Sequence, residues 1–224
     1  MSTTPSPPDQ PFSASAPPLS LTERRKAETR MEIARAAAAL FVRRGLRATR
    51  AEDIAQAAGI APRTFYRYFA TKEEAVAPLY AAGAQRWTEA VRTAPGRLTV
   101  PEALHHAVHQ TLTPGAGVSA MSWEWVRTLI RLADASPALR KVWAEVCQTS
   151  EVALAEILAA RGAGAGPGIT PDLRFAAAVA GAAVRVAVEA WAGTAAPPTG
   201  PDGPAALALR NLEALRDFGW GSRR

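Results

Sequence analysis

Residues 49–72 read TRAEDIAQAAGIAPRTFYRYFATK and contain two short helical patterns joined by a glycine turn. Thr49 and Glu52 have the spacing of a capping box, in which each side chain satisfies a backbone N–H of the other residue, and they predict a helix over residues 50–58. After the glycine turn, Pro62 suits the first position of a second helix, where a missing N–H costs nothing. Two helices joined by a glycine-containing turn are typical of a helix-turn-helix.

The second of these helices, predicted over residues 62–69, has one apolar side and one polar side. Phe65 and Phe69 lie four positions apart, so we expect both to face the protein core. The remaining positions carry guanidinium groups, a hydroxyl and phenol rings but no carboxylate: Arg63, Thr64, Tyr66, Arg67 and Tyr68. Arginine can form paired bonds to guanine in the major groove, and hydroxyls suit phosphates. A solvated, mildly basic helix face is the alternative, but two exposed tyrosines favour DNA contact.

Helix-start signals extend this pattern on both sides. Two further capping boxes flank the segment: Ser20 with Glu23, and Thr71 with Glu74. They predict one helix over residues 21–44 and another that reaches residue 93. Lys72 lies at the start of the later helix, where backbone N–H groups and the helix dipole favour a phosphate. Residues 20–74 are therefore predicted to form a three-helix DNA-binding domain.

The composition of the chain is that of a helical protein. Of its 224 residues 48% are hydrophobic, and many of these are alanine, the residue with the highest helix propensity. No run of 18 residues is uniformly apolar, which predicts no membrane span, and the N-terminal residues lack the apolar stretch of a secretory signal. A single cysteine, Cys147, excludes an intrachain disulfide and fits a reducing compartment. We therefore expect an all-α cytoplasmic protein.

Basic residues concentrate near the N-terminus. Residues 20–74 hold 12 Lys and Arg against 7 Asp and Glu, whereas residues 75–224 hold 14 against 12. Most of the net charge of +6 therefore comes from one quarter of the chain, as expected of a nucleic-acid-binding domain. An arginine-rich helical surface of no special function gives the same pattern, so charge alone does not decide between them.

The rest of the chain divides into a tail and a larger domain. Residues 1–19 are rich in Pro, Ser and Ala and are predicted to form a disordered tail. Residues 75–224 are predicted to form a helical domain for ligand binding and dimerisation. Capping residues and Pro/Gly loops place its later helices at residues 101–112, 119–133, 137–161, 171–191 and 204–218.

Residues 30–74 resemble the tetracycline-repressor (TetR) family of bacterial transcriptional regulators. The matching positions are Ile33, Leu40-Phe41, Gly45, Thr49, Asp53-Ile54-Ala55, Ala58-Gly59-Ile60, Thr64-Phe65-Tyr66, Tyr68-Phe69 and Lys72-Glu73-Glu74. The resemblance implies double-stranded operator DNA as the partner. It places Thr49 and Arg50 at the DNA, Pro62, Arg63 and Thr64 near base edges, and Tyr66, Tyr68 and Lys72 at the phosphate backbone. Ala61 stands where the family usually has a capping serine.

The layout of the remaining helices is similar to the same family, which implies a homodimer joined through the last two helices. Small apolar residues allow close helix approach, and leucines can add larger contacts. The predicted interface residues are Val179, Ala183, Val186, Ala187, Ala190, Leu207, Leu212 and Leu215. Ordinary core packing within one chain is the alternative. A dimer also suits operator DNA, because half-sites lie roughly 34–36 Å apart on one face of the duplex.

A pocket for a small-molecule effector is expected between residues 98 and 191, where large aromatic residues gather. The predicted ligand-binding residues are Trp123, Arg127, Arg131, Trp143, Arg185 and Glu189. Residues 123–140 resemble a TetR subgroup associated with acyl-CoA-like ligands, which implies a hydrophobic acid or thioester whose charge pairs with arginine. Core packing is the alternative for each tryptophan.

Other functions receive less support from the residues. His105, His106 and His109 could suggest a metal site, but no further ligand has suitable spacing, so solvated histidines are expected and no cofactor is predicted. We find no nucleophile with its base, no phosphate loop and no paired carboxylates, which argues against an enzyme. The sequence thus predicts a ligand-responsive repressor. An activator and a non-specific architectural DNA-binding protein are the alternatives, and a small helical enzyme is the weakest.

Overall fold

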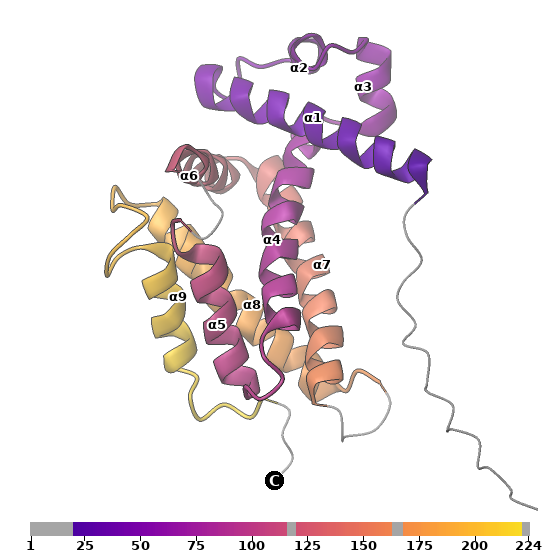
Figure 1. Cartoon of the computed structure of the whole chain (residues 1–224). Helices are drawn as coiled ribbons and strands as arrows, with labels where there is room; N and C mark the ends of the chain where they lie inside the picture. The colour runs from indigo at the N-terminus through magenta and orange to yellow at the C-terminus, as the bar shows by residue number, and fades with distance from the viewer. Residues whose placement is uncertain (1–19, 116–119, 163–167, 221–224) are drawn as a thin grey trace, which may run out of the picture.

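The computed structural model describes residues 20–115, 120–162 and 168–220, so the tail predicted for residues 1–19 lies outside it. The described residues form nine α-helices and one 3₁₀ helix and contain no strand, which confirms the predicted all-α fold (Figure 1). The elements are α1 (Leu21–Arg44), α2 (Ala51–Ala57), α3 (Pro62–Tyr68), η1 (Glu74–Val76), α4 (Ala77–Thr93), α5 (Val100–Leu112), α6 (Ala120–Ala135), α7 (Pro137–Arg161), α8 (Pro171–Ala192) and α9 (Pro204–Glu213).

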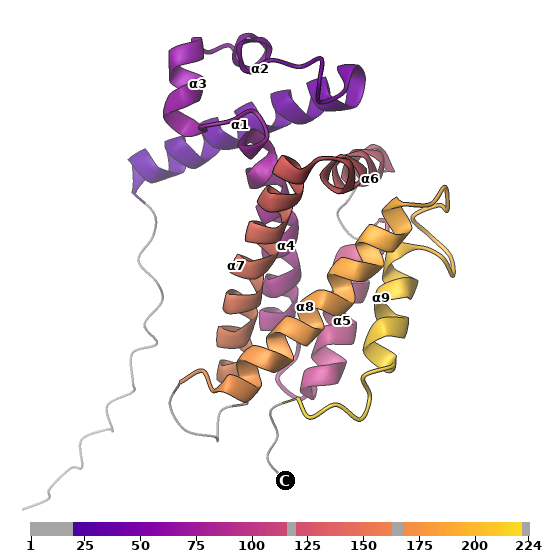
Figure 2. The ribbon, with the colours of Figure 1, turned by 180° about the vertical axis from the view of Figure 1, so that it is seen from behind.

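The first three helices form a unit at one end of the molecule. Helices α2 and α3 lie against α1, and both views show this unit standing clear of α5, α8 and α9 (Figures 1 and 2). Its core consists of fully buried side chains from all three helices, among them Phe41 of α1, Ile54 of α2 and Phe65 of α3. Burying large apolar side chains stabilises such a unit, because each contributes about 1.5–3 kcal/mol.

Local signals explain where α1 and α2 begin. The Ser20–Glu23 capping box is present, with Glu23 N donating to Ser20 Oγ at 3.2 Å and Ser20 N donating to Glu23 Oε2 at 3.1 Å. The cap of α2 is shifted by one residue from the predicted Thr49–Glu52 pair. Asp53 Oδ2 instead accepts the N–H of Arg50 at 2.9 Å. The prediction failed because an Asp three positions after Arg50 can reach back as readily as the Glu before it.

The long helix predicted from Lys72 begins later. Glu74 N donates to Thr71 Oγ1 at 3.2 Å, but the Glu74 carboxylate accepts from Ala70 N at 3.0 Å instead of closing the box on Thr71. A short 3₁₀ turn follows, and α4 starts at Ala77 with Pro78 in its first turn. The link between the three-helix unit and the body is therefore a tight turn that leads directly into α4.

The body is a bundle in which α4 packs on α5 and α7, while α8 packs on α7 and α9. Helix α6 lies across the top of this bundle, beneath α1, in both views (Figures 1 and 2). One continuous hydrophobic core runs from the three-helix unit through Tyr80 of α4 and Leu129 of α6 to Trp191 of α8. The division into domains at residue 74 remains a prediction, because apolar contacts cross it.

Arg161, the last residue of α7, fixes the loop between α4 and α5. Its guanidinium donates to four backbone carbonyl oxygens, that of Val91 in the last turn of α4 at 3.2 Å and those of Ala94 at 2.8 Å, Pro95 at 3.0 Å and Leu98 at 3.2 Å in the loop. Loop carbonyls that are half-buried need such partners, and the planar guanidinium can supply several donors at once. Arg161 thus joins the ends of α4 and α7.

Helix α8 bears on the expectation that the chain has no membrane span. Among the described helices it alone is long and apolar enough for a membrane span, with a mean hydropathy of 1.5 over its most apolar window. Many alanines contribute to this value. Three of them, Ala176, Ala180 and Ala187, are buried against the neighbouring helices inside the protein. We therefore interpret α8 as a core helix of the bundle.

Candidate DNA-binding face and ligand cavity

Helix α3 turns its phenylalanines inward and its polar residues outward. Phe65 is fully buried and Phe69 nearly so, whereas Tyr66 is 51% exposed. Arg63 and Arg67 are exposed as well, and Thr64 and Tyr68 are half-buried. We call Arg63, Thr64, Tyr66, Arg67 and Tyr68 the outer face of α3. It lies at the end of the molecule remote from α9 (Figure 1).

The start of α3 matches the sequence interpretation. Ala61 supplies no side-chain cap to the helix, and Pro62 occupies its first turn. Both residues are exposed, so the uncapped N–H groups at this end are open to solvent or to an anion.

A carboxylate accompanies the outer face, contrary to expectation. Tyr66 Oη donates to Glu52 Oε1 at 3.3 Å, and Arg50 Nε lies 3.7 Å from Glu52 Oε2. Desolvation of the phenol and the neighbouring Glu52 charge raise the pKa of Tyr66, so it stays a hydrogen-bond donor at neutral pH. Glu52 belongs to α2, which is why the sequence of α3 alone did not reveal it. The contact holds the Tyr66 ring in one orientation.

Thr49 and Lys72 have structural roles instead of the exposed positions expected for DNA contacts. Thr49 is fully buried, and its hydroxyl donates to the carbonyl of Gly45 at 2.9 Å. Lys72 is half-buried, and its Nζ donates to the carbonyls of Leu46 and Thr49, each at 2.8 Å. The prediction for Thr49 is therefore wrong in this conformation, because its side chain has no exposed surface. Lys72 has at most one N–H left for a phosphate.

Arg30 supports α3 from the other side and was not found from the sequence. Its guanidinium donates to the carbonyl of Tyr68 at 2.9 Å and lies 4.5 Å from the centre of the Phe69 ring. A positive charge at a helix C-terminus is favourable because of the helix dipole. No local spacing could have indicated this contact, since 38 positions separate Arg30 from Tyr68.

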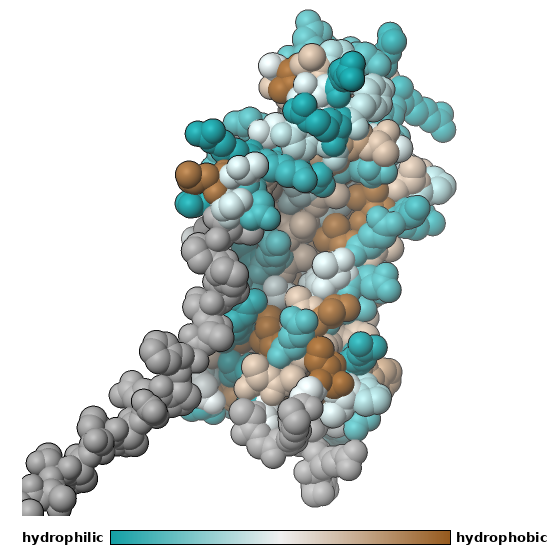
Figure 3. Space-filling model, turned by 90° about the vertical axis from the view of Figure 1, so that its right-hand side faces the viewer, coloured by the Kyte–Doolittle hydropathy of each residue, from teal (hydrophilic) through white to brown (hydrophobic). Residues whose placement is uncertain are grey.

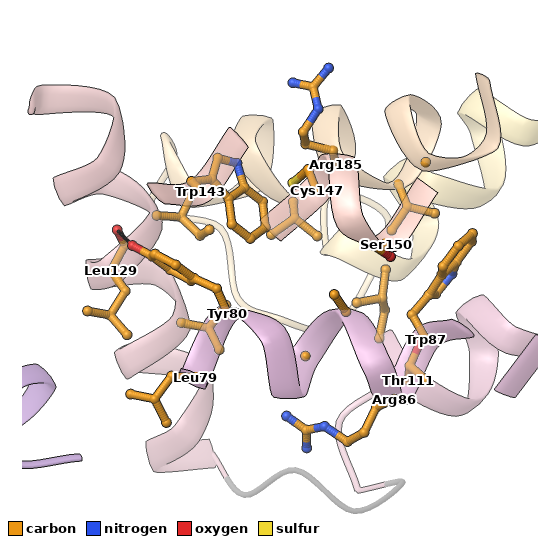
Figure 4. Close-up of a pocket in the computed structure, with 18 of the residues that line it drawn as sticks. Leu79, Tyr80, Arg86, Trp87, Thr111, Leu129, Trp143, Cys147, Ser150 and Arg185 are labelled. Atoms are coloured by element: carbon orange, nitrogen blue, oxygen red, sulfur yellow. Dashed lines mark hydrogen bonds between the residues drawn. The ribbon is translucent and has the colours of Figure 1, made fainter. Parts of the chain in front are cut away.

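The body contains a cavity of about 440 Å³ that is lined by α4, α5, α6, α7 and α8. Its walls are mainly apolar and rich in aromatic rings: Tyr80, Trp87, Trp123, Trp125 and Trp143. Figure 4 shows Tyr80 and Trp143 directed toward each other from α4 and α7, and their ring centres lie 5.1 Å apart. A mainly apolar cavity with few polar groups is typical of a small-molecule site.

The predicted ligand-binding residues divide into two groups. Trp123, Trp143 and Arg185 line the cavity. Glu189 lies behind it, where its carboxylate accepts from Trp143 Nε1 at 2.7 Å and pairs with Arg185 at 3.1 Å. In this arrangement the charges of Glu189 and Arg185 compensate each other.

The other two predicted arginines do not line the cavity. Arg127 places its guanidinium 4.4 Å from the centre of the Trp191 ring and donates to the carbonyl of Ala196. Arg131 is exposed at the surface. These two predictions are therefore corrected. The sequence marks both residues as cations of α6 but does not show that one packs on Trp191 and the other points to solvent.

Tyr80, Cys147 and Glu151 also line the cavity, and the sequence did not single them out for this role. Tyr80 donates its hydroxyl to the carbonyl of Leu129 at 2.9 Å, and burial raises its pKa far above the usual value. Burial also raises the pKa of the Cys147 thiol to about 12. Burial raises the pKa of Glu151 as well, although the charge of Arg185 opposes that shift.

Comparisons with known proteins agree with these features. The family model described as bacterial regulatory proteins, tetR family, matches residues 33–77, which run from α1 to the start of α4. The HTH-type transcriptional regulator TcmR of Streptomyces glaucescens is 29% identical over 175 residues, which cover 76% of each chain. The three-helix unit of this chain is that of the TetR family of transcriptional regulators.

Two further proteins similar to this chain are informative. The HTH-type transcriptional repressor KstR2 of Mycobacterium tuberculosis is 53% identical over 47 residues, covering 21% of this chain and 24% of the repressor. The crystal structure of Thermus thermophilus FadR, a TetR-family repressor in complex with lauroyl-CoA, is similar to this chain with a TM-score of 0.54, and the two sequences are 25% identical. That match covers 87% of this chain and 96% of FadR.

Helix α8 has an apolar stripe on its outer side. Phe175 is 63% exposed and Val186 is 47% exposed, while Ala190 is exposed and Val179 is half-buried. The spacing of these four residues places them on one side of the helix. We call them the α8 stripe. Figure 3 shows hydrophobic side chains gathered on the body, whereas the surface of the three-helix unit is mostly hydrophilic.

The other predicted interface residues are less accessible. Ala183, Ala187 and Leu212 are buried within the chain, so we correct the prediction that they meet a partner. Leu207 and Leu215 are half-buried. Helix α8 is apolar on nearly every side, so helical periodicity could not separate its inner residues from its outer ones. The sequence analysis also did not predict Phe175 as an interface residue.

The histidines of α5 do not gather into a metal site. Among the described residues, no group of three His, Cys, Asp or Glu side chains could hold a metal ion. His109 is exposed, and His105 and His106 are half-buried. Burial, followed by the charge of His109, lowers the pKa of His105.

Proposed function

We propose that this TetR-family regulator is a homodimeric repressor that binds double-stranded operator DNA with α3 and releases it when a small apolar molecule fills the cavity. The observation that carries the proposal is the connection between two sites through one helix. Helix α4 follows the turn that leaves α3, and its residues Tyr80 and Trp87 form one wall of the cavity. KstR2 and FadR, both named as repressors, support repression over activation.

In this proposal the outer face of α3 enters the major groove. Arg63 offers paired donors to guanine, and Pro62 and Thr64 approach neighbouring base edges. Arg50, Tyr66 and Tyr68 contact the phosphate backbone, to which Lys72 can add at most one bond. The hydrogen bond between Tyr66 and Glu52 orients the phenol before DNA arrives.

The α8 stripe supplies the dimer interface in this proposal. An exposed Phe and Val on one side of a helix cost free energy in water, and a second copy of the helix covers both by a two-fold arrangement. Leu207 of α9 and Leu215, which follows α9, are half-buried and can add apolar contacts to this interface. Two recognition helices are then available for two half-sites.

Release follows from the position of α4 between the sites. A ligand that separates Tyr80 of α4 from Trp143 of α7 displaces α4 and changes the angle between body and α3. Arg35 of α1 also lines the cavity, so a ligand contacts the DNA-binding unit directly as well. The equilibrium between the DNA-binding and the released conformation can shift only as far as the difference in ligand affinity between these two conformations allows.

The effector is a small hydrophobic molecule in this proposal. An acyl-CoA-like ligand has the support of FadR with lauroyl-CoA and of the resemblance in α6. We further propose a cytoplasmic regulator without enzymatic activity, as its relatives are named as regulators.

The experiment that tests the proposal is selection of genomic DNA by the purified chain, followed by sequencing. We expect recovery of one palindromic sequence with half-sites about one helical turn apart, lying in a promoter region. Recovery of fragments without a common sequence would favour a non-specific architectural protein. Recovery of the palindrome with increased transcription of the adjacent gene would favour an activator.

A further inference from the structure

Glu52, the second residue of α2, uses both carboxylate oxygens on residues that the proposed function assigns to the phosphate backbone. Its Oε1 accepts from Tyr66 Oη at 3.3 Å, and its Oε2 lies 3.7 Å from Arg50 Nε. The side chains of Arg50 and Glu52 are 77% and 48% exposed, and Tyr66 is exposed as well. A carboxylate thus lies on the open surface between two groups whose expected partner is a DNA phosphate.

The Tyr66 hydroxyl cannot serve Glu52 and a phosphate at the same time. A phenol has a single O–H donor, and in the free chain that donor goes to Glu52. A phosphate oxygen only accepts hydrogen bonds, so Tyr66 can donate to it only after the hydroxyl hydrogen rotates away from Glu52. The bond to Glu52 is exposed and therefore contributes little net free energy, because water and phosphate compete with it. DNA can replace this bond, but the exchange lowers the gain from the phosphate contact.

The charge of Glu52 adds to this competition. Arg50 is partly neutralised by the carboxylate, and a phosphate bonded to Tyr66 would lie within a few ångströms of the same carboxylate. Like charges at such distances repel each other, because salt screens mainly those separations that exceed about 10 Å. We infer that the Glu52 carboxylate takes the place of a DNA phosphate in the free regulator and lowers its affinity for duplexes of every sequence. The inference rests on the proposed function, which places Arg50 and Tyr66 at the phosphate backbone.

A helix-stabilising role is the alternative for Glu52. It lies in the first turn of α2, where a carboxylate is favourable because of the helix dipole. Asp53 also lies in that turn, and its carboxylate accepts the N–H of Arg50 at 2.9 Å. The variant Glu52→Gln keeps an acceptor oxygen for Tyr66 but removes the charge. A purely helix-stabilising Glu52 predicts a less stable variant with unchanged DNA affinity, whereas a competing carboxylate predicts a variant that binds DNA more tightly.

Fluorescence anisotropy with the full-length chain measures this affinity. Two labelled duplexes of equal length are used, one with the palindrome selected from genomic DNA and one with its bases shuffled. At low salt we expect Glu52→Gln to bind both about tenfold more tightly than the unaltered chain does. Its affinity should also fall more steeply with salt, by about one phosphate contact.

Glu32→Gln is the matched control for the loss of one negative charge. Glu32 is exposed on α1, and it lies two positions from Arg30, whose guanidinium bonds α3. Two positions correspond to rather more than half a helical turn, so Glu32 faces away from α3. We expect Glu32→Gln to bind both duplexes with nearly the affinity of the unaltered chain.

Variants of the two donors assign the effect to the contacts of Glu52. Tyr66→Phe and Arg50→Ala should each weaken binding to both duplexes, since each removes a group that contacts a phosphate. In a chain that carries both changes, Glu52→Gln should raise the affinity by about threefold at most, because only the direct repulsion between carboxylate and phosphate remains.

The outcomes separate this inference from the proposed function. Equal affinities of Glu52→Gln and Glu32→Gln overturn the inference and leave the proposed function intact. So does a gain confined to the palindrome, since Glu52 would then act on bases, and so does a tenfold gain in the chain that lacks both donors. If Tyr66→Phe and Arg50→Ala leave DNA binding unchanged, the inference fails together with the phosphate contacts assigned to these residues. An unaltered chain that binds neither duplex overturns both the inference and the proposed function.

Discussion

The ammonium of Lys72 lies 2.8 Å from the carbonyl oxygen of Thr49 and equally close to that of Leu46. Lys72 thereby ties the turn before α4 to the loop before α2. Helix α4, which begins shortly after Lys72, lines the cavity, so these hydrogen bonds hold the end of the DNA-binding unit that leads into the cavity wall. A residue expected from the sequence to hold a phosphate is thus mainly a positioning residue.

Lys72→Ala should therefore destabilise the fold. Two charge-assisted hydrogen bonds are lost, and we expect the free energy of unfolding to fall by about 2 kcal/mol, measured by urea denaturation. Lys26→Ala, which removes the same charge from an exposed position of α1, should leave stability unchanged. An unchanged stability of Lys72→Ala, with a salt dependence of DNA binding reduced by about one ion, would instead assign Lys72 to a phosphate.

The guanidinium of Arg161 has a comparable role at the other end of α4. Arg161→Ala removes hydrogen bonds to four backbone carbonyls at the end of α4 and in the loop that follows, so we expect the free energy of unfolding to fall by about 3 kcal/mol, measured by urea denaturation. Arg97 is exposed in the same loop and provides the control, since Arg97→Ala removes equal charge without loss of these bonds. Equal stability of the two variants would contradict this role.

The α8 stripe should control assembly. Val186→Asp places a charge on each copy of the proposed two-fold interface, where the two carboxylates would meet without a partner. We expect light scattering to show a monomer where the unaltered chain is a dimer. Val42→Asp, on the exposed side of α1, should stay dimeric. If Val186→Asp remained dimeric, the interface would lie elsewhere.

Cys147 should react slowly. With a pKa of about 12, little of its thiol is ionised at neutral pH, and only the thiolate is a nucleophile. Because burial favours the neutral thiol, we expect iodoacetamide labelling to be on the order of a thousandfold slower than in the urea-unfolded chain. The rate should rise about tenfold per pH unit until the thiol ionises. Equal labelling of folded and unfolded chains at neutral pH would show that the thiol is not buried.

The sequence predicted those features that depend on neighbouring residues. The helices α7 and α8 begin at Pro137 and Pro171, as expected from the residues that cap them. The inward turn of Phe65 and Phe69 followed from helical periodicity alone. These features could be predicted because capping and amphipathic spacing act within a few positions of the chain.

The missed features are contacts between distant parts of the chain. Arg30 meets Tyr68 from 38 positions away, and Lys72 reaches Leu46 over 26 positions. The lining of the cavity was also only partly predicted from the sequence. Its tryptophans on α6 and α7 were expected, but Tyr80 and Trp87 of α4 were not, because the pocket was expected only between residues 98 and 191. Which side of a helix meets a neighbour depends on tertiary packing, which periodicity does not contain.

The position of α3 on DNA is tested most directly by methylation interference at guanine N7, an acceptor in the major groove. We expect methylated guanines in two successive major grooves of the selected duplex to block binding by the unaltered chain. Arg63→Ala should weaken binding by about 1–3 kcal/mol. Binding of this variant should no longer be affected by one of those methyl groups in each half-site. Binding that ignores N7 methylation in both grooves would contradict the account, because the outer face of α3 would then not read the duplex.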